Sequence, residues 1–290
     1  MKMKNRIGNR ETILACVLAY LSLIASQLTA LLAGQGIVKT GLPAAAGIAV
    51  SAVLYVLIEM FLLYFILKKF LKLSFYECRI VPQVTIKPVW GLAAVILPVL
   101  VIFMAALTPG RWSVTGMNAG ELCYTIVDAA AFYGLTVGIV EEAVFRGVIM
   151  TAIERRWNKY AAVLIPSLIF AMSHAIGAEL DAAGMIQLVA AGSLVGILFS
   201  LVTYESGSVW NSALIHAVWN FLIVGGIFNI GTSGNDQFLF NYVLDSRNFA
   251  VTGGDFGIEA SAFSVIGYAV FSAAALWMIM RERRARQRED

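Results

Sequence analysis

Apolar residues are grouped along this chain in long runs, which short polar or basic segments separate. Eight runs are present, at about residues 12–33, 44–67, 89–108, 122–150, 160–177, 184–203, 208–230 and 260–280. A helix needs about 20 consecutive apolar residues to cross the hydrocarbon core of a bilayer. The pattern therefore predicts an all-α, polytopic membrane protein with about eight transmembrane helices. We expect residues 1–290 to form a single membrane domain.

The segments between and within the runs add detail to this prediction. Residues 68–88 are basic and aromatic, which fits either an amphipathic surface helix or a plain basic loop. Residues 231–259 are rich in Gly, Asn and Asp and are expected to form the longest polar loop. Two glycine pairs with G-x-x-x-G spacing, Gly134 with Gly138 and Gly192 with Gly196, predict close helix–helix contacts.

The composition excludes several classes of protein. Hydrophobic residues make up 60% of the chain and charged residues only 13%, against roughly 25% charged residues in a soluble domain. This excludes a soluble enzyme and a disordered chain. The net charge of +3 gives no support for a nucleic-acid partner. The three cysteines form no C-x-x-C pair, so neither a disulfide framework nor a cysteine zinc site is indicated.

The distribution of lysine and arginine predicts the orientation in the membrane. If the N-terminus is inside, the inside segments hold 17 of the 21 basic residues. The outside loops then hold only Lys39, Arg111 and Arg247, and Arg146 lies within the fourth run. Cytoplasmic loops are enriched in basic residues. We therefore expect a multi-pass protein of the cell membrane with both termini in the cytoplasm.

Three charged residues lie close together in the fourth run, Glu141, Glu142 and Arg146. A charged residue at the centre of a membrane helix costs about 2.5–3.5 kcal/mol on insertion scales and marks a candidate functional site. Glu142 and Arg146 are four residues apart and can form an ion pair on one face of a helix. Glu141 is rotated by about 100° from Glu142. Because one arginine cannot neutralise two acids, Glu141 needs another partner.

The two histidines of the chain, His174 and His216, lie in the fifth and seventh runs. Phe170 precedes His174 by one helical turn, and Asn220 follows His216 by one turn. A glutamate and a histidine can act as a general base while another histidine and an asparagine polarise a carbonyl group. The same residues could instead hold a divalent metal such as zinc that activates water. Since no serine or cysteine lies in a nucleophile motif, we expect a hydrolase that uses water inside the membrane.

These residues form three motifs that resemble those of the CAAX prenyl endopeptidase family, also called the CPBP or Abi family of intramembrane proteases. The motifs follow in the family's order, as Glu141-Glu142-x-x-x-Arg146, Phe170-x-x-x-His174 and His216-x-x-x-Asn220. The resemblance covers about residues 125–225, which would form the catalytic core. It implies a glutamate-dependent or metal-dependent endopeptidase that hydrolyses a peptide bond in a peptide or membrane-protein substrate within the bilayer.

The resemblance also implies a role for each motif residue. Glu141 would be the general base that activates water, and His174 would assist in proton transfer. His216 and Asn220 would stabilise the tetrahedral oxyanion. Glu142 and Arg146 would hold the site together. Whether a metal such as zinc takes part is left open by the resemblance.

Two other functions are compatible with the sequence. The protein could be a non-catalytic membrane regulator or immunity protein that retains the protease fold and binds a sensor kinase or a peptide. It could also be a transporter, since Glu, Arg and His within the membrane mark ion paths as well. No inverted repeat supports the transporter. Neither the substrate nor the biological pathway follows from the sequence.

Overall fold

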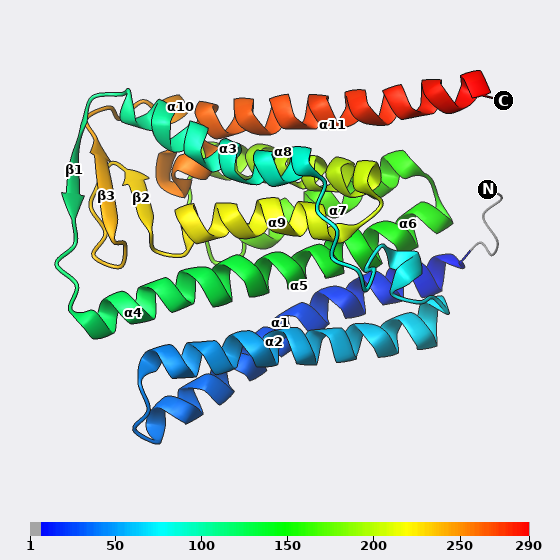
Figure 1. Ribbon diagram of the computed structural model, residues 1–290, viewed down its shortest axis with the longest axis horizontal. Helices are drawn as coiled ribbons and strands as arrows, with labels where there is room; N and C mark the ends of the chain where they lie inside the picture. The colour runs from blue at the N-terminus through cyan, green and yellow to red at the C-terminus, as the bar shows by residue number, and fades with distance from the viewer. Residues whose placement is uncertain (1–6, 290) are drawn as a thin grey trace.

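The structure is a computed structural model that describes residues 7–289, and it is an elongated bundle of antiparallel helices with a small sheet at one end (Figure 1). The basic residues Lys2, Lys4 and Arg6, and the side chain of Arg288, lie outside this description. The main helices, besides one long composite helix, are α1 (Asn9–Lys39), α2 (Ala44–Ile66), α3 (Pro88–Ala106), α7 (Lys159–His174), α8 (Ala182–Ser206), α9 (Val209–Trp219) and α11 (Ala262–Glu289).

The composite helix runs without a break from Ala119 to Arg156. It consists of α4 (Ala119–Val127), the π-helical segment η3 (Asp128–Val137), α5 (Gly138–Glu142), the π-helical segment η4 (Ala143–Ile149) and α6 (Met150–Arg156). Asn118 and Glu121 form a capping box at its start. Glu141 and Glu142 lie in α5, between these two π-helical segments. π-helical turns change the direction of the side chains that follow and often occur at functional sites.

The prediction of a nearly all-α, polytopic membrane protein is confirmed, and each of the eight apolar runs contains a helix. Within residues 7–289, six helices are long and apolar enough to cross a membrane. Two apolar helices are shorter, namely α7 and the segment Val209–Val224, which joins α9 to the π-helical η5 (Asn220–Val224). The helices differ from the approximate apolar runs at several ends. α1, the composite helix and α11 extend beyond their runs, to Lys39, Arg156 and Glu289, whereas the fifth helix ends at His174 and the seventh at Val224, short of residues 177 and 230.

A three-stranded sheet, which the sequence analysis did not predict, lies at the end of the bundle away from the termini (Figure 1). Its strands are β1 (Gly110–Val114), β2 (Phe228–Gly231) and β3 (Phe240–Leu244), with β3 between the other two. β3 is antiparallel to β1 and parallel to β2. The predicted polar loop 231–259 is therefore partly ordered, and it also contains α10 (Phe249–Thr252) and the 3₁₀ turns η6 (Gly254–Phe256) and η7 (Ile258–Ala260).

Helix α2 continues through the π-helical segment η1 (Leu67–Leu71). The rest of the basic segment folds back onto the bundle as a loop with one short 3₁₀ turn, η2 (Tyr76–Cys78). Arg79 forms an ion pair with Glu154 and donates a hydrogen bond to the Thr151 hydroxyl at 2.9 Å, which attaches the loop to α6. Cys78 is fully buried beneath the loop, and this burial raises the pKa of its thiol to about 12. The loop interpretation of this segment is therefore correct.

Helices α1 and α2 form a hairpin with a buried acid, Glu59, at its centre. The hydroxyls of Ser22 and Ser26 on α1 donate to the two carboxylate oxygens of Glu59, each at 2.8 Å. Hydrogen bonds of this kind offset the cost of burying an acid in an apolar environment. Glu59 thus has a structural explanation in the pairing of the two helices.

Candidate active site

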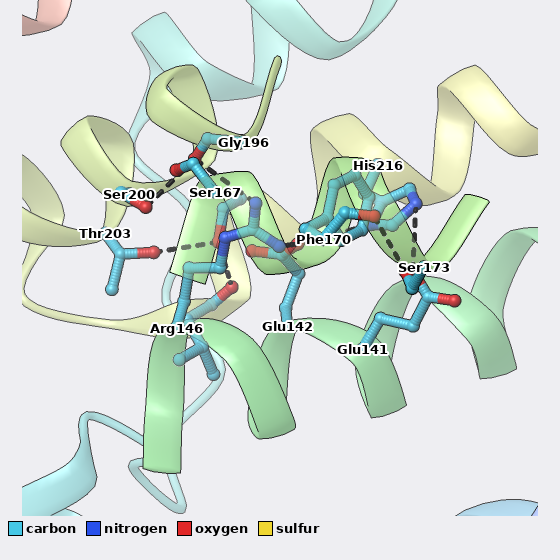
Figure 2. A network of polar contacts seen from close by, with 12 residues as sticks. Glu141, Glu142, Arg146, Ser167, Phe170, Ser173, Gly196, Ser200, Thr203 and His216 are labelled. Atoms are coloured by element: carbon cyan, nitrogen blue, oxygen red, sulfur yellow. Dashed lines mark hydrogen bonds and ion pairs between the residues drawn. The ribbon is translucent and has the colours of Figure 1, made fainter. Parts of the chain in front are cut away.

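The buried ion pair of Glu142 and Arg146 forms the base of the site. Arg146 Nη1 donates to Glu142 Oε1 at 2.8 Å, and both side chains are fully buried. Nη2 donates to the carbonyl oxygen of Gly196 on α8 at 3.2 Å. The guanidinium carbon lies 4.6 Å from the ring centre of Phe170 on α7 and 5.1 Å from that of Phe199 on α8. One arginine therefore connects the composite helix to α7 and α8 (Figure 2).

The glycine pairs allow the helices around this ion pair to approach closely. A methyl group at Gly196 would come within 2.8 Å of Ser167, so α7 and α8 are nearly in backbone contact there. A methyl group at Gly138 would come within about 3 Å of the backbone of Ala217 on α9. The predicted helix contacts are thus present at Gly196 and at Gly138. The contact at Gly138 brings α9 close to the two glutamates.

His216 on α9 lies between the two glutamates. Its Nδ1 is 3.3 Å from Glu142 Oε1, and its Nε2 is 3.8 Å from Glu141 Oε2. The imidazole is buried and is stacked on Phe199, with ring centres 4.9 Å apart and an interplanar angle of 19°. Since Glu142 already receives the Arg146 guanidinium, the contact with His216 fixes the histidine ring relative to both acids.

Glu141 differs from Glu142 in being open to a cavity. Its side chain is 17% exposed, whereas that of Glu142 is fully buried. Among residues 7–289, Oε2 of each glutamate lacks a hydrogen-bond partner, so the two acids differ in exposure and not in this respect. Figure 2 shows Glu141 on the opposite side of Glu142 from Arg146. Glu141 is thus the acid of this pair whose side chain reaches a cavity.

A cavity of about 240 Å³ brings together four of the six candidate residues, Glu141, His174, His216 and Asn220. Glu142 and Arg146 are absent from its lining because they are buried behind its wall. A glutamate, two histidines and an asparagine from three different helices therefore face one space. The arrangement can position a water molecule against a polar substrate group.

His174 and Asn220 are each oriented by a backbone carbonyl group. Nδ1 of His174 is 2.8 Å from the carbonyl oxygen of Phe170, which requires Nδ1 to be the donor. Nε2 is then the nitrogen left for proton exchange. Nδ2 of Asn220 donates to the carbonyl oxygen of Tyr133 at 3.1 Å. An amide nitrogen carries two hydrogens, so Asn220 retains a second donor.

Sequence reasoning missed two polar residues that line the same cavity, Gln27 on α1 and Glu259 on η7. Gln27 could have been noticed as a polar residue inside the first apolar run. Glu259 gave no such signal, because it lies in a polar segment where an acid is unremarkable. Its Oε1 accepts a hydrogen bond from the Trp219 indole at 2.8 Å.

The donor set of the cavity does not fit a metal ion. Among the residues that the structure describes, no three His, Cys, Asp or Glu side chains are placed to hold one. Glu142 is engaged by Arg146 and His216, and Nδ1 of His174 is engaged by a carbonyl group. The expectation of a metalloprotease therefore has no support, and we derive no step through a metal.

Comparison with known families places this site in context. Residues 124–222 match the family described as type II CAAX prenyl endopeptidase Rce1-like. No curated protein matches the chain. The matched segment contains all six candidate residues, and it supports a CAAX protease-type intramembrane endopeptidase. The resemblance seen in the three motifs is thus confirmed by a family-model match over residues 124–222, to the Rce1-like type II CAAX prenyl endopeptidases.

Proposed function

We propose that this protein is an intramembrane endopeptidase that hydrolyses a peptide bond with a water molecule activated by Glu141. The observation that carries the proposal is the Glu141 side chain, which is partly exposed, unlike that of Glu142, and lines a cavity together with both histidines. A general base needs space for the molecule that it deprotonates.

The placement of the side chains supports the following reaction. Glu141 takes a proton from water as the water oxygen attacks the carbonyl carbon of the peptide bond. We assign the stabilisation of the oxyanion that forms to Nε2 of His216, which donates when both ring nitrogens carry a hydrogen, and to the second amide hydrogen of Asn220. His174 assists in moving the proton to the nitrogen of the leaving amine, so the peptide bond breaks and one water is consumed.

Glu142 and Arg146 serve this reaction by holding the site in shape. Glu142 fixes the His216 ring, and Arg146 balances the charge of Glu142. We further propose that residues 125–225 are the catalytic core of a single membrane domain comprising residues 1–290. The substrate is a peptide or membrane protein in the bilayer of the cell.

The Glu141→Gln variant tests the proposed function. Glutamine keeps the size of the side chain and removes the base, so turnover should be abolished while the amount of folded protein in the membrane is unchanged. Proteomic comparison of membranes from wild-type and variant cells would identify the substrate. Cleavage of that substrate by purified protein in lipid nanodiscs would then measure turnover. Glu179→Gln, which changes an exposed acid, is the control and should retain full activity.

Two results would contradict the proposal. Full cleavage by Glu141→Gln would overturn the assignment of the base. A biological effect that persists in cells carrying only Glu141→Gln would instead favour a regulator or immunity protein that keeps the protease fold without using it. The two results are separable because one is measured with purified protein and the other in cells.

A further inference from the structure

The cavity at the candidate active site contains a second acid that the proposed reaction does not use. Glu259 lies on η7, outside the Rce1-like segment, and lines the same cavity as Glu141 and the two histidines. Its Oε1 accepts the Trp219 indole hydrogen at 2.8 Å. In the described chain, no donor is hydrogen-bonded to Oε2 and no lysine or arginine is paired with the carboxylate.

The position of Glu259 relative to the site is fixed by its neighbours. The carbonyl oxygen of Ala260 accepts a hydrogen bond from Gln187 of α8 at 2.7 Å. The carbonyl oxygen of Ile258 accepts one from the Ser264 hydroxyl at 2.6 Å. Trp219, which orients the carboxylate, directly precedes Asn220 on the helix that carries His216. The backbone on each side of Glu259 is thus held by other elements and its carboxylate by Trp219, and a side chain held in this way can recognise a ligand with a defined geometry.

The charged residues that line the site cavity and its larger neighbour are all acidic. A larger cavity of about 810 Å³ at the sheet end shares Tyr133 and Val224 with the site cavity and is lined by Glu121, Asp128 and Asp236. Neither lining includes a lysine or an arginine among the described residues. Basic residues outnumber acidic ones in the whole chain, 21 to 18. The acidic lining of the two cavities is therefore opposite in sign to the net charge of the protein. A cleft lined by one charge attracts molecules of the other charge.

We propose that Glu259 binds a cationic side chain of the substrate, so that the enzyme selects peptide segments with a lysine or arginine close to the scissile bond. The proposal rests on the proposed function and names its substrate class. A cation that enters a membrane-embedded site loses its hydration, and a fixed carboxylate compensates for this loss. The acids of the larger cavity attract the same charge along the path from the sheet end.

A set of matched peptides tests the selection. The probes are apolar fluorogenic peptides in which one position on either side of the central bond is lysine, norleucine or glutamate. With wild-type protein in lipid nanodiscs, kcat/KM for the best lysine peptide should exceed that of its norleucine counterpart by at least about tenfold. Glu259→Gln still accepts the Trp219 hydrogen bond but should remove this preference. Glu259→Lys should reverse it in favour of glutamate.

Asp255→Asn is the matched control, because Asp255 is an exposed acid on the same segment that lines neither cavity. It should keep the preference for lysine. If wild-type protein shows no preference, or if Glu259→Gln retains it, the inference is overturned while the protease activity stands.

A failure of catalysis can be told apart from a failure of recognition. If the wild-type protein cleaves none of the peptides, the proposed function is in doubt, and binding of the same peptides to the Glu141→Gln protein becomes the measurement. Tighter binding of the lysine peptide than of the norleucine peptide, lost in Glu141→Gln/Glu259→Gln, would support recognition by Glu259. Equal affinities for the two peptides would overturn it.

Discussion

At the scale of single residues, two adjacent glutamates have different environments because they point in different directions from one helix. Glu142 is fully buried and carries the contacts of Arg146 and His216, whereas Glu141 faces the cavity. Replacing either by glutamine removes one negative charge. The consequences should differ, because only one of the two charges compensates a buried cation.

Glu142→Gln should therefore destabilise the protein as well as inactivate it. It leaves the Arg146 guanidinium buried without its counter-ion, and breaking a buried pair costs about 3–5 kcal/mol. Thermal unfolding in detergent should show a marked decrease in Tm, with less protein in the membrane. Glu282→Gln is the control, because Glu282 pairs with Arg286 at the same i,i+4 spacing on an exposed surface. An equal loss of Tm in both variants would refute this explanation.

The sequence predicted part of this site and missed another part for a physical reason. The spacing of Glu142 and Arg146 on one helix is local, so their ion pair could be inferred from helix geometry alone. The place of His216 between the two acids depends on how α9 packs against α5, which residue spacing does not encode. Glu259 comes to the cavity from a segment 118 positions after Glu141, and its role depends entirely on tertiary structure.

At the scale of elements, the approach of α5 to α9 sets the distance between the glutamates and His216. Gly138 lies on α5 one turn before Glu142, and a methyl group there would be 3.0 Å from the backbone nitrogen of Ala217. Such a distance is too short for an unstrained contact, so a side chain at this position must separate the helices.

Gly138→Ala should consequently reduce turnover and lower stability by about 1–3 kcal/mol, the usual cost of overpacking a well-packed interior. The kcat for an identified substrate and the Tm in detergent are the measurements. Gly36→Ala is the control, since Gly36 lies in α1 with open space around it and should tolerate a methyl group. Unchanged turnover in Gly138→Ala would show that the contact does not set the geometry of the site.

The elements also differ in how well the sequence predicted them. The apolar runs are continuous and long, so the helices were found, with errors confined to their ends. The sheet was missed because β1 and β3 are short and their paired residues lie far apart in the sequence, from 134 positions for Gly110 and Leu244 to 126 for Val114 and Phe240. The π-helical segments η3 and η4 were missed because a change of hydrogen-bonding register leaves no pattern of apolar residues.

At the scale of the whole molecule, the distribution of basic residues along the sequence leads us to propose that the two ends of the bundle lie on opposite sides of the membrane. The start of α1 and the end of α11 lie at one end and the sheet at the other (Figure 1). Reporter fusions within the loop after β2, at Gly234, and after Arg281 should report opposite sides of the membrane, with Arg281 in the cytoplasm. Reporters on the same side, or an external Arg281, would contradict the topology of eight spans.

The shortness of α7 has a consequence for how a lipid-embedded site obtains water. A helix of 16 residues extends about 24 Å, less than the hydrocarbon thickness of about 30 Å. His174 is its last residue, and the partly exposed residues 175–181 continue as turns and irregular backbone with a few i→i+3 hydrogen bonds, such as that from Ala178 to the carbonyl oxygen of Ala175. Irregular backbone at membrane depth is stable only when protein covers it or water solvates it.

We therefore expect the bilayer to be hydrated at this point, with water reaching His174 from the sheet end. In a Cys123→Ser background, which removes an exposed native thiol, Ala178→Cys should react with a charged maleimide that cannot cross the membrane. Leu168→Cys, on the exposed apolar face of α7, should stay unreactive. Equal protection of both thiols would refute a hydrated opening. Because α7 is shorter than the hydrocarbon layer, water, the second reactant of hydrolysis, would thus reach a site that the surrounding lipid otherwise keeps dry.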